Sequence, residues 1–484
     1  MAAASACGGA GCGPHCSSSA GAEEDAPEER LGQLSISGTA STACGKCDGG
    51  GAAVAAAGGA GMCGECFRAY LFGKFKTAIT SNAMVRPTDT VLVAFSGGPS
   101  SRVALQFIHE MQSKAIQSWE TSNSQALPVF GVGVAFVDES SILSPKPKHE
   151  VESALEDIRS IVSSLSPSEK AVHIASLGDV FSSESEEGVG RLREVVGMIG
   201  DETGRDDFLQ RLRMLLLQKI ALENGYTKVM LGSCASGIAC HVLSATVKGH
   251  GYSLPADVQY VDTRWEVPVV LPLRDCLAQE LSLLCKLDSL KTQQLLDRPG
   301  SGINSLVASF IARLREENPS REHTILRTAQ KLKPFSFNKF SANGYHDFLP
   351  SRLRPKFQNI DNNESTFPEI LCLICGSPFS ESELQNLEST KHKTQKKIDL
   401  YTAHCCQSCC FQIIPSDTNM FEHFFSLLPK FWTDKVNSAS ASQDTLRDQI
   451  EDYLLEDDDR LQRQLALVHE QENTGMWTLE CEIH

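Results

Sequence analysis

A Gly- and Ser-rich turn between two apolar segments constrains the fold of this chain more than any other feature. The apolar run at 91–95 predicts a buried strand, and the apolar residues spaced through 103–108 predict a helix. Between them, two glycines permit a tight turn, and the helix N-terminus directs its partial positive charge at the same point. A turn that only joins strand to helix has a similar composition. We predict a phosphate-binding loop, whose contacts are assigned to Ser96, Gly97, Gly98, Ser100 and Ser101.

Strand and helix patterns alternate from residue 90 to about residue 290. Apolar runs buried on both faces and separated by helices predict an α/β domain, in which a parallel sheet has helices on both faces. Ligands in such sheets bind at the carboxyl ends of the strands, so the loop, Asp138 and the turn at 232–236 are expected on one rim. The further strands are predicted at 129–137, 171–176, 228–231 and 267–271, and two of the helices at 150–165 and 208–222.

Charge limits the partners that the chain can bind. Its formal net charge of -16 argues against a generally basic nucleic-acid binder, so any RNA contact would be local. The basic and aromatic segment 321–365 is the best RNA-facing candidate, although a linker that packs its aromatic rings on the main domain fits equally well. Four cations near the helix at 208–222 form either a phosphate-facing stripe or a solvated face: Arg205, Arg211, Arg213 and Lys219.

The composition indicates a cytosolic chain. No apolar run approaches the ~20 residues that cross a membrane, and the first residues lack the basic-then-apolar order of a signal peptide. In that setting, eighteen cysteines with several CxxC pairs favour metal binding over disulfides.

Two sets of CxxC pairs predict structural zinc sites. In the first, a Gly- and Ala-rich spacer joins two pairs and offers no core in which free thiols could be buried. In the second, doubled cysteines at 405–406 and 409–410 leave the ligands ambiguous, and His404 could replace one sulfur. The assigned ligands are Cys44, Cys47, Cys63 and Cys66 for the first site and Cys372, Cys375, Cys406 and Cys409 for the second.

Composition also divides the chain into segments. We predict a disordered Ala/Gly/Ser-rich tail at the start and an acidic tail, either docking a partner or solvated, at the end. The predicted order is tail 1–43, zinc module 44–80, α/β domain 81–320, basic connector 321–365, zinc module 366–435 and acidic tail 436–484.

Several motifs resemble those of known families. The loop is similar to the SGGxDS loop of the N-type ATP pyrophosphatases, or PP-loop enzymes, except that Ser100 stands in place of the acidic residue. The strings LGSCASGIACHVLSATVKGHG and VPVVLPLRDC, with both sets of cysteine pairs and the SGG loop, resemble the cytoplasmic tRNA 2-thiolation protein 2 family. The resemblance covers nearly all of the chain from residue 44 to about residue 432.

This resemblance implies a function. Members of that family form a heterodimer with a catalytic PP-loop subunit, and together they transfer sulfur from a thiocarboxylated ubiquitin-like carrier to the wobble uridine of tRNA(Lys), tRNA(Glu) and tRNA(Gln). The resemblance also implies that ATP binds the loop, which is degenerate because Ser100 replaces the acidic residue. On the same resemblance, we assign Lys248 as a positive contact to nucleotide or RNA.

The catalytic relatives carry two motifs that are missing here. They have a CxxC motif where the helix of this chain reads DDFLQRLRMLLLQKI, and a GHNxDD turn where it reads GSCAS. Cys234 and Cys240 are the rim thiols that remain, and a small residue packed at a tight turn is the commoner role for a cysteine such as Cys234. We therefore predict a subunit that is not catalytic alone. The rival hypotheses are a self-sufficient ATP-dependent tRNA sulfurtransferase and a zinc-dependent protein scaffold without RNA contact.

Overall fold

The computed structural model describes residues 44–47, 54–55, 61–121, 129–143, 147–166, 169–182, 185–293, 302–333, 335, 370–391, 401–429 and 432. All of them belong to one compact unit, Ile36–His484. The predicted tails at 1–43 and 436–484, and residues 336–365 of the basic connector, lie outside the described residues.

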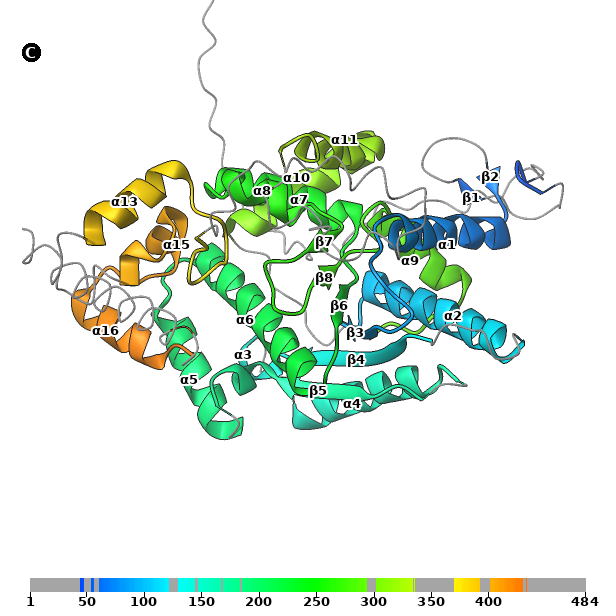
Figure 1. Cartoon of the computed structure of the whole chain (residues 1–484), viewed down its shortest axis with the longest axis horizontal. Helices are drawn as coiled ribbons and strands as arrows, with labels where there is room; N and C mark the ends of the chain where they lie inside the picture. The colour runs from blue at the N-terminus through cyan, green and yellow to red at the C-terminus, as the bar shows by residue number, and fades with distance from the viewer. Residues whose placement is uncertain are drawn as a thin grey trace, which may run out of the picture. The chain divides into compact units, whose positions relative to one another are not determined.

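A six-stranded sheet with the strand order β5-β4-β3-β6-β8-β7 forms the centre of this unit (Figure 1). β3 lies between β4 and β6 and pairs in parallel with both, so that Val93 is opposite Val134 on one side and Met230 on the other. β7 is antiparallel to β8 and was not predicted, because its two residues are too few for a strand pattern. The strands are β3 (Thr90–Ala94), β4 (Gly131–Asp138), β5 (Val172–Ser176), β6 (Lys228–Leu231), β7 (Val261–Asp262) and β8 (Val269–Val270).

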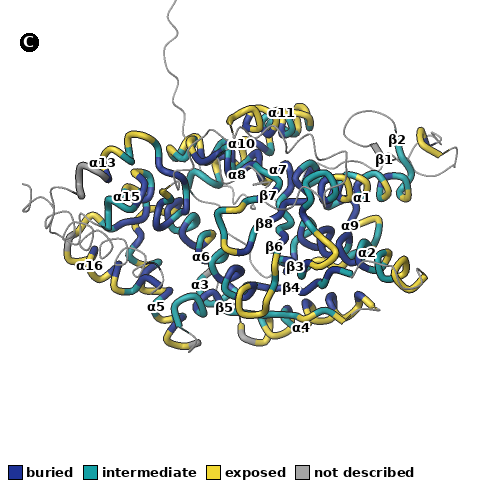
Figure 2. The backbone as a smooth tube through the Cα atoms, in the orientation of Figure 1, coloured by how far each residue is buried: buried dark blue, intermediate teal, exposed yellow. Residues whose placement is uncertain are grey.

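Helices cover the sheet, as the alternating pattern predicted. α2 contacts β3 and β4, while α6 contacts β4 and β6. The helices of the α/β region are α2 (Pro99–Thr121), α3 (Ser140–Leu143), α4 (Lys148–Ser163), α5 (Ser185–Met198), α6 (Glu202–Glu223), α7 (Ala235–Val247), α8 (Leu254–Asp257) and α9 (Ala278–Leu287), followed by α10 (Gly302–Glu317) and α11 (Ser320–Ala329). Figure 2 shows the central strands buried and the outer helix surfaces exposed.

Two smaller parts flank this region. Before it come the short antiparallel strands β1 (Val54–Ala55) and β2 (Gly61–Met62) and the helix α1 (Gly64–Ser81). After it come α13 (Glu381–Lys391), α15 (Gln407–Gln412) and α16 (Thr418–Leu427), which lie beside α5 and α6 in Figure 1.

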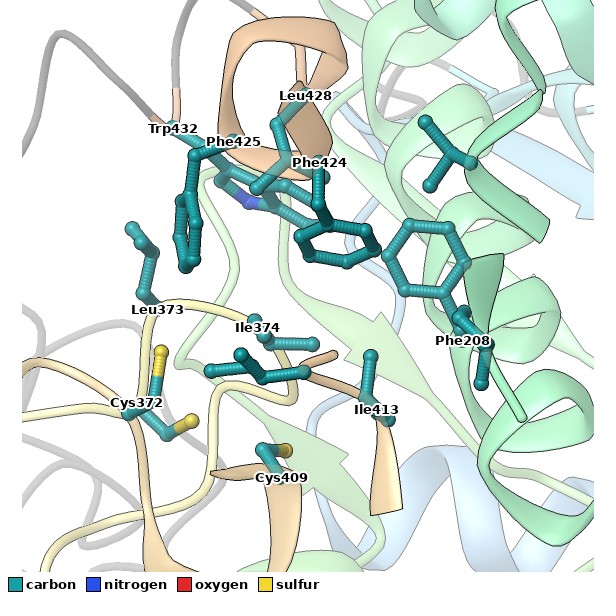
Figure 3. Close-up of a cluster of buried hydrophobic side chains, with 14 of the residues drawn as sticks. Phe208, Cys372, Leu373, Ile374, Cys409, Ile413, Phe424, Phe425, Leu428 and Trp432 are labelled. Atoms are coloured by element: carbon teal, nitrogen blue, oxygen red, sulfur yellow. The ribbon is translucent and has the colours of Figure 1, made fainter. Parts of the chain in front are cut away.

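The C-terminal helices share a hydrophobic core with α5 and α6. Phe208 of α6 is fully buried, and its ring centroid lies 6.2 Å from that of Phe424 and 6.0 Å from that of Trp432 (Figure 3). Ile374 and Cys409 belong to the same cluster of buried side chains. Burial of several aromatic rings against one helix stabilises this docking strongly.

Candidate functional site

The predicted phosphate loop joins β3 to α2 and is held by close backbone contacts. Gly97 has a φ of 81°, and a Cβ built there would lie 1.8 Å from the carbonyl oxygen of Gln293. The Gln293 N–H in turn donates to the Gly97 carbonyl oxygen at 2.9 Å. A Cβ on Gly232 would lie 2.6 Å from the Ser101 backbone nitrogen. Both positions therefore need glycine, and the loop is fixed in its conformation.

The two loop hydroxyls bond to each other and to the loop backbone. The Ser101 hydroxyl donates to the Gly98 carbonyl at 3.0 Å and accepts from the Ser96 N–H at 3.2 Å and the Ser96 hydroxyl at 3.1 Å. Ser101 is buried, whereas Ser96 is exposed and Ser100 is half-buried. Both loop hydroxyls are therefore already bonded within the protein, and anion binding by this loop stays a prediction.

The structure places most of the predicted loop contacts on one rim, and Lys248 elsewhere. Asp138 is the last residue of β4, and its carboxylate accepts from the Ser140 N–H at 2.9 Å. Lys248 lies at the far end of α7, about 20 Å along a 13-residue helix that begins at the rim. Its ammonium group donates to both carboxylate oxygens of Asp207, at 2.8 and 2.7 Å, and to Asn304. A nucleotide contact by Lys248 stays a prediction.

Of the two rim thiols, Cys234 is buried and Cys240 is half-buried. Cys234 is the N-cap of α7 and is 6% exposed. Burial raises the pKa of Cys240 to about 11, that of Cys276 to about 12 and that of Cys285 to about 11. Since the thiolate is the reactive form, these three groups are poor nucleophiles at neutral pH.

The first set of cysteines forms a cluster beside α1. The Sγ atoms of Cys44, Cys47, Cys63 and Cys66 all lie within 4.8 Å of one another. The Cys63 N–H donates to the Cys44 sulfur at 3.2 Å, and backbone bonds of this kind lower the pKa of Cys44 to about 6. Cys63 is also the N-cap of α1, where the helix dipole favours negative charge.

The second set forms a cluster of the same kind, made of the four cysteines that were assigned as its ligands. The sulfurs of Cys372, Cys375, Cys406 and Cys409 lie within 4.8 Å of one another. Cys406 is the N-cap of α15, and its N–H donates to the Cys372 sulfur at 3.2 Å. Cys410 instead directs its Sγ to the carbonyl oxygens of Thr402 and Cys405.

Both clusters fit a metal ion. Each offers four sulfurs, the donor set of a structural site with no open position, and backbone N–H groups donate to Cys44 and Cys63 in the first cluster and to Cys372 and Cys406 in the second. Burial alone would raise the pKa of Cys372, but hydrogen bonds from the neighbouring thiols lower this pKa below its usual value. Two thiol clusters that could each hold a metal ion are thus present.

Three of the four cations on α6 contact protein groups, so these three form neither a phosphate-facing stripe nor a fully solvated face. Arg211 is half-buried, with its guanidinium carbon 4.1 Å from the centre of the Trp265 ring, and desolvation lowers its pKa to about 10. Arg213 pairs with the buried carboxylate of Glu139, and Lys219 donates to the Asp179 carbonyl at 2.8 Å. The sequence could not place Arg211, because its partner Trp265 lies in the loop between β7 and β8, and no local pattern on the helix indicates that contact.

Comparison with known proteins identifies relatives of this chain, although no family model matches it. A rice protein (Oryza sativa subsp. japonica) named cytoplasmic tRNA 2-thiolation protein 2 is 78% identical over 463 residues, which are 95% of this chain and 99% of that protein. Relatives of the same name from Arabidopsis thaliana and Xenopus tropicalis are 48% and 24% identical, covering 83% and 76% of this chain and 87% and 81% of their own. That name describes them as cytoplasmic, in agreement with the location expected for this chain.

Among solved structures, the U34-tRNA thiolase NcsA from Methanococcus maripaludis, with its [4Fe-4S] cluster, matches at a TM-score of 0.47 and 17% identity. The match covers 60% of this chain and 86% of that one. No described helix is long and apolar enough to cross a membrane. At 78% identity over nearly the whole length, the chain belongs to the cytoplasmic tRNA 2-thiolation protein 2 family.

Proposed function

We propose that this chain is a subunit of a tRNA 2-thiolation complex that does not carry out the sulfur chemistry itself. The family name and the nucleotide-type loop on the sheet rim support a role in tRNA thiolation. The finer proposal is a heterodimer with a catalytic PP-loop subunit that modifies the wobble uridine of tRNA(Lys), tRNA(Glu) and tRNA(Gln). In it, the sulfur comes from a thiocarboxylated ubiquitin-like carrier.

The observation that carries this proposal is that the two rim thiols, Cys234 and Cys240, are poorly suited to act as nucleophiles. Thiolation of a uridine needs a sulfur nucleophile and ATP to activate the 2-carbonyl oxygen. Cys234 is buried at a helix cap, and burial raises the pKa of Cys240 to about 11. Ser100 also supplies no carboxylate to order Mg²⁺ beside the loop. Activation and sulfur transfer are therefore assigned to the partner.

Single-turnover thiolation assays test this division of labour. The chain alone should transfer no sulfur to tRNA, and the chain with its catalytic partner should restore transfer. Cys234→Ser and Cys240→Ser in the reconstituted complex should leave the rate unchanged. Thiolation by this chain alone, or loss of the rate in either variant, would support the self-sufficient sulfurtransferase instead.

We also propose zinc as the ion of both clusters. Four thiolates with no open position are typical of structural zinc, and their role is folding. Metal analysis of the purified chain should give two zinc ions per chain. Iron in either cluster, with the absorption of an iron–sulfur centre, would contradict the assignment.

A protein scaffold without RNA contact is the second candidate. The observation in its favour is that the loop hydroxyls of Ser96 and Ser101 already bond within the loop. Crosslinking tRNA to the complex and mapping the adducts distinguishes the two functions. Adducts confined to the catalytic partner would favour the scaffold.

A further inference from the structure

A cavity of about 350 Å³ opens beside the carboxyl end of β4. Its wall begins at Ser141 in α3, three residues after Asp138 ends the strand. The carboxyl ends of parallel strands are where ligands bind in sheets of this kind. The lining residues come from α3, α5 and α6, none of them acidic: Ser141, Ile142, Arg193, Val196, Gly197 and Arg205.

Two arginines in this cavity are fixed by backbone carbonyls. Arg193 donates from Nε and Nη2 to the Ser141 carbonyl oxygen, at 3.1 and 3.0 Å. Arg205 donates from Nε to the Ile199 carbonyl oxygen. Among the described residues, Nη1 of Arg193 and both terminal nitrogens of Arg205 have no protein acceptor. Their N–H groups are therefore available to a ligand, and a guanidinium suits the oxygens of a phosphate.

A serine hydroxyl in the same wall also lacks a partner. The Oγ atom of Ser141 is buried and has no hydrogen-bond partner in the described part of the chain. A buried donor without an acceptor is destabilising. A side-chain rotation that turned this hydroxyl to the cavity surface would let a phosphate oxygen accept from it.

Neighbouring carboxylates do not cancel the charge of the two arginines. Glu139 pairs with Arg213, and Glu194 pairs with a histidine of α16. Asp201 caps α6 through the Gly204 N–H at 2.7 Å. Glu202 is exposed to solvent, where its interactions are screened.

We propose that this cavity, the Arg193–Arg205 pocket, binds a backbone phosphate of tRNA, an inference that rests on the proposed function. Arg193 and Gly197 are exposed, so the backbone of a polymer can reach the pocket from solvent. The apolar lining consists of Ile142 and Val196, with no aromatic ring on which a base could stack. These features favour a phosphodiester over a free nucleotide.

Binding of tRNA to the complex of the full chain with its catalytic partner, measured against salt concentration, tests this pocket. The double variant Arg193→Gln with Arg205→Gln should bind tRNA roughly tenfold more weakly, with a salt slope smaller by about one, as expected for one lost phosphate contact. Arg191→Gln is the matched control, because Arg191 lies on the same helix but pairs with Glu187 and is outside the cavity. Its affinity and slope should stay at the wild-type values.

Two further variants separate phosphate binding from structural anchoring. Arg193→Lys with Arg205→Lys keeps the charge but loses the bonds to the carbonyls, so it should keep most of the salt slope. Ser141→Ala should weaken binding about twofold to threefold without lowering the melting temperature. If the lysine variant loses as much affinity as the glutamine variant, the arginines only anchor the helices and the inference is wrong.

The tRNA-binding measurements also distinguish failure of the pocket from failure of the proposed function. Wild-type binding of tRNA with no difference between the double variant and Arg191→Gln would overturn the pocket and leave the proposed function standing. No tRNA binding by the wild-type complex would overturn both. Binding of ADP by the wild type that the double variant loses would assign the pocket to a free nucleotide and overturn the tRNA phosphate.

Discussion

The two cysteine clusters have the same ligands and similar backbone bonds, but they differ in what surrounds them. In the first, Cys47 is exposed and only Cys44 is buried, while in the second three of the four cysteines are buried. The first is attached through α1, in which Phe67 and Phe75 are buried and the ring of Phe75 packs on Phe107 of α2. The second lies in the same core cluster as α5, α6 and α16.

The same four-cysteine motif can therefore stabilise either a short local segment or the packing of several helices. Where the sulfurs lie among buried aromatic rings, loss of the ion would disturb packing across several helices. Where they lie at a surface beside a helix that packs on its own, loss of the ion would release mainly the short segment between the pairs.

The largest effect is expected from Cys409→Ser. It should remove one of two metal ions and destabilise the fold by about 4 kcal/mol or more, because a buried ligand and its core are lost together. Metal content and chemical denaturation measure both. Cys410→Ser is the matched control, since Cys410 lies outside the cluster and should keep both ions. Equal effects of the two changes would contradict the ligand assignment.

Removal of the ring that closes the shared core tests whether packing, and not only the metal, holds the second cluster. Trp432 is 2% exposed and contacts Phe208, so Trp432→Ala should cost about 3–5 kcal/mol. Phe411 is 89% exposed, so Phe411→Ala should change stability by less than about 0.5 kcal/mol. Equilibrium unfolding compares the two. A small effect at Trp432 would mean that the module does not depend on this core.

An arginine lies beside the second cluster. Arg211 is half-buried near Cys375, and its charge would offset the negative charge of metal-bound thiolates. Arg211→Met should lower the metal affinity of that cluster by roughly 10- to 100-fold, the usual effect of losing a supporting partner. Competition with a chelator measures it, with the exposed Arg159→Met as control. Unchanged affinity would show that the cluster does not need the cation.

The smallest effect on global stability is expected at the first cluster. Cys66→Ser should release one metal ion but cost only about 1 kcal/mol, because α1 stays packed through its apolar face. Hydrogen exchange should rise at 61–66 and stay unchanged in α5 and α6. Faster exchange in α5 or α6 would show that the two clusters are coupled and would break the contrast.

The sequence predicted the parts of the fold that depend on local pattern. β6 has the predicted bounds, and the other four parallel strands differ from theirs by a few residues. Spacing alone left the assignment of Cys406 and Cys409 ambiguous, because the direction of each sulfur depends on how the chain turns at the start of α15. The Lys248 ion pair with Asp207 joins α7 to α6, a contact that no local pattern encodes.

The long sequence separation within the shared core has a consequence for synthesis of the chain. His423 pairs with Glu194, 229 residues earlier, and Phe208 is covered by rings that follow the whole sheet. A nascent chain on the ribosome would expose this apolar face of α5 and α6 until its last module emerges. Such exposure slows folding and invites aggregation, so production of this protein should depend on chaperones and on available metal during translation.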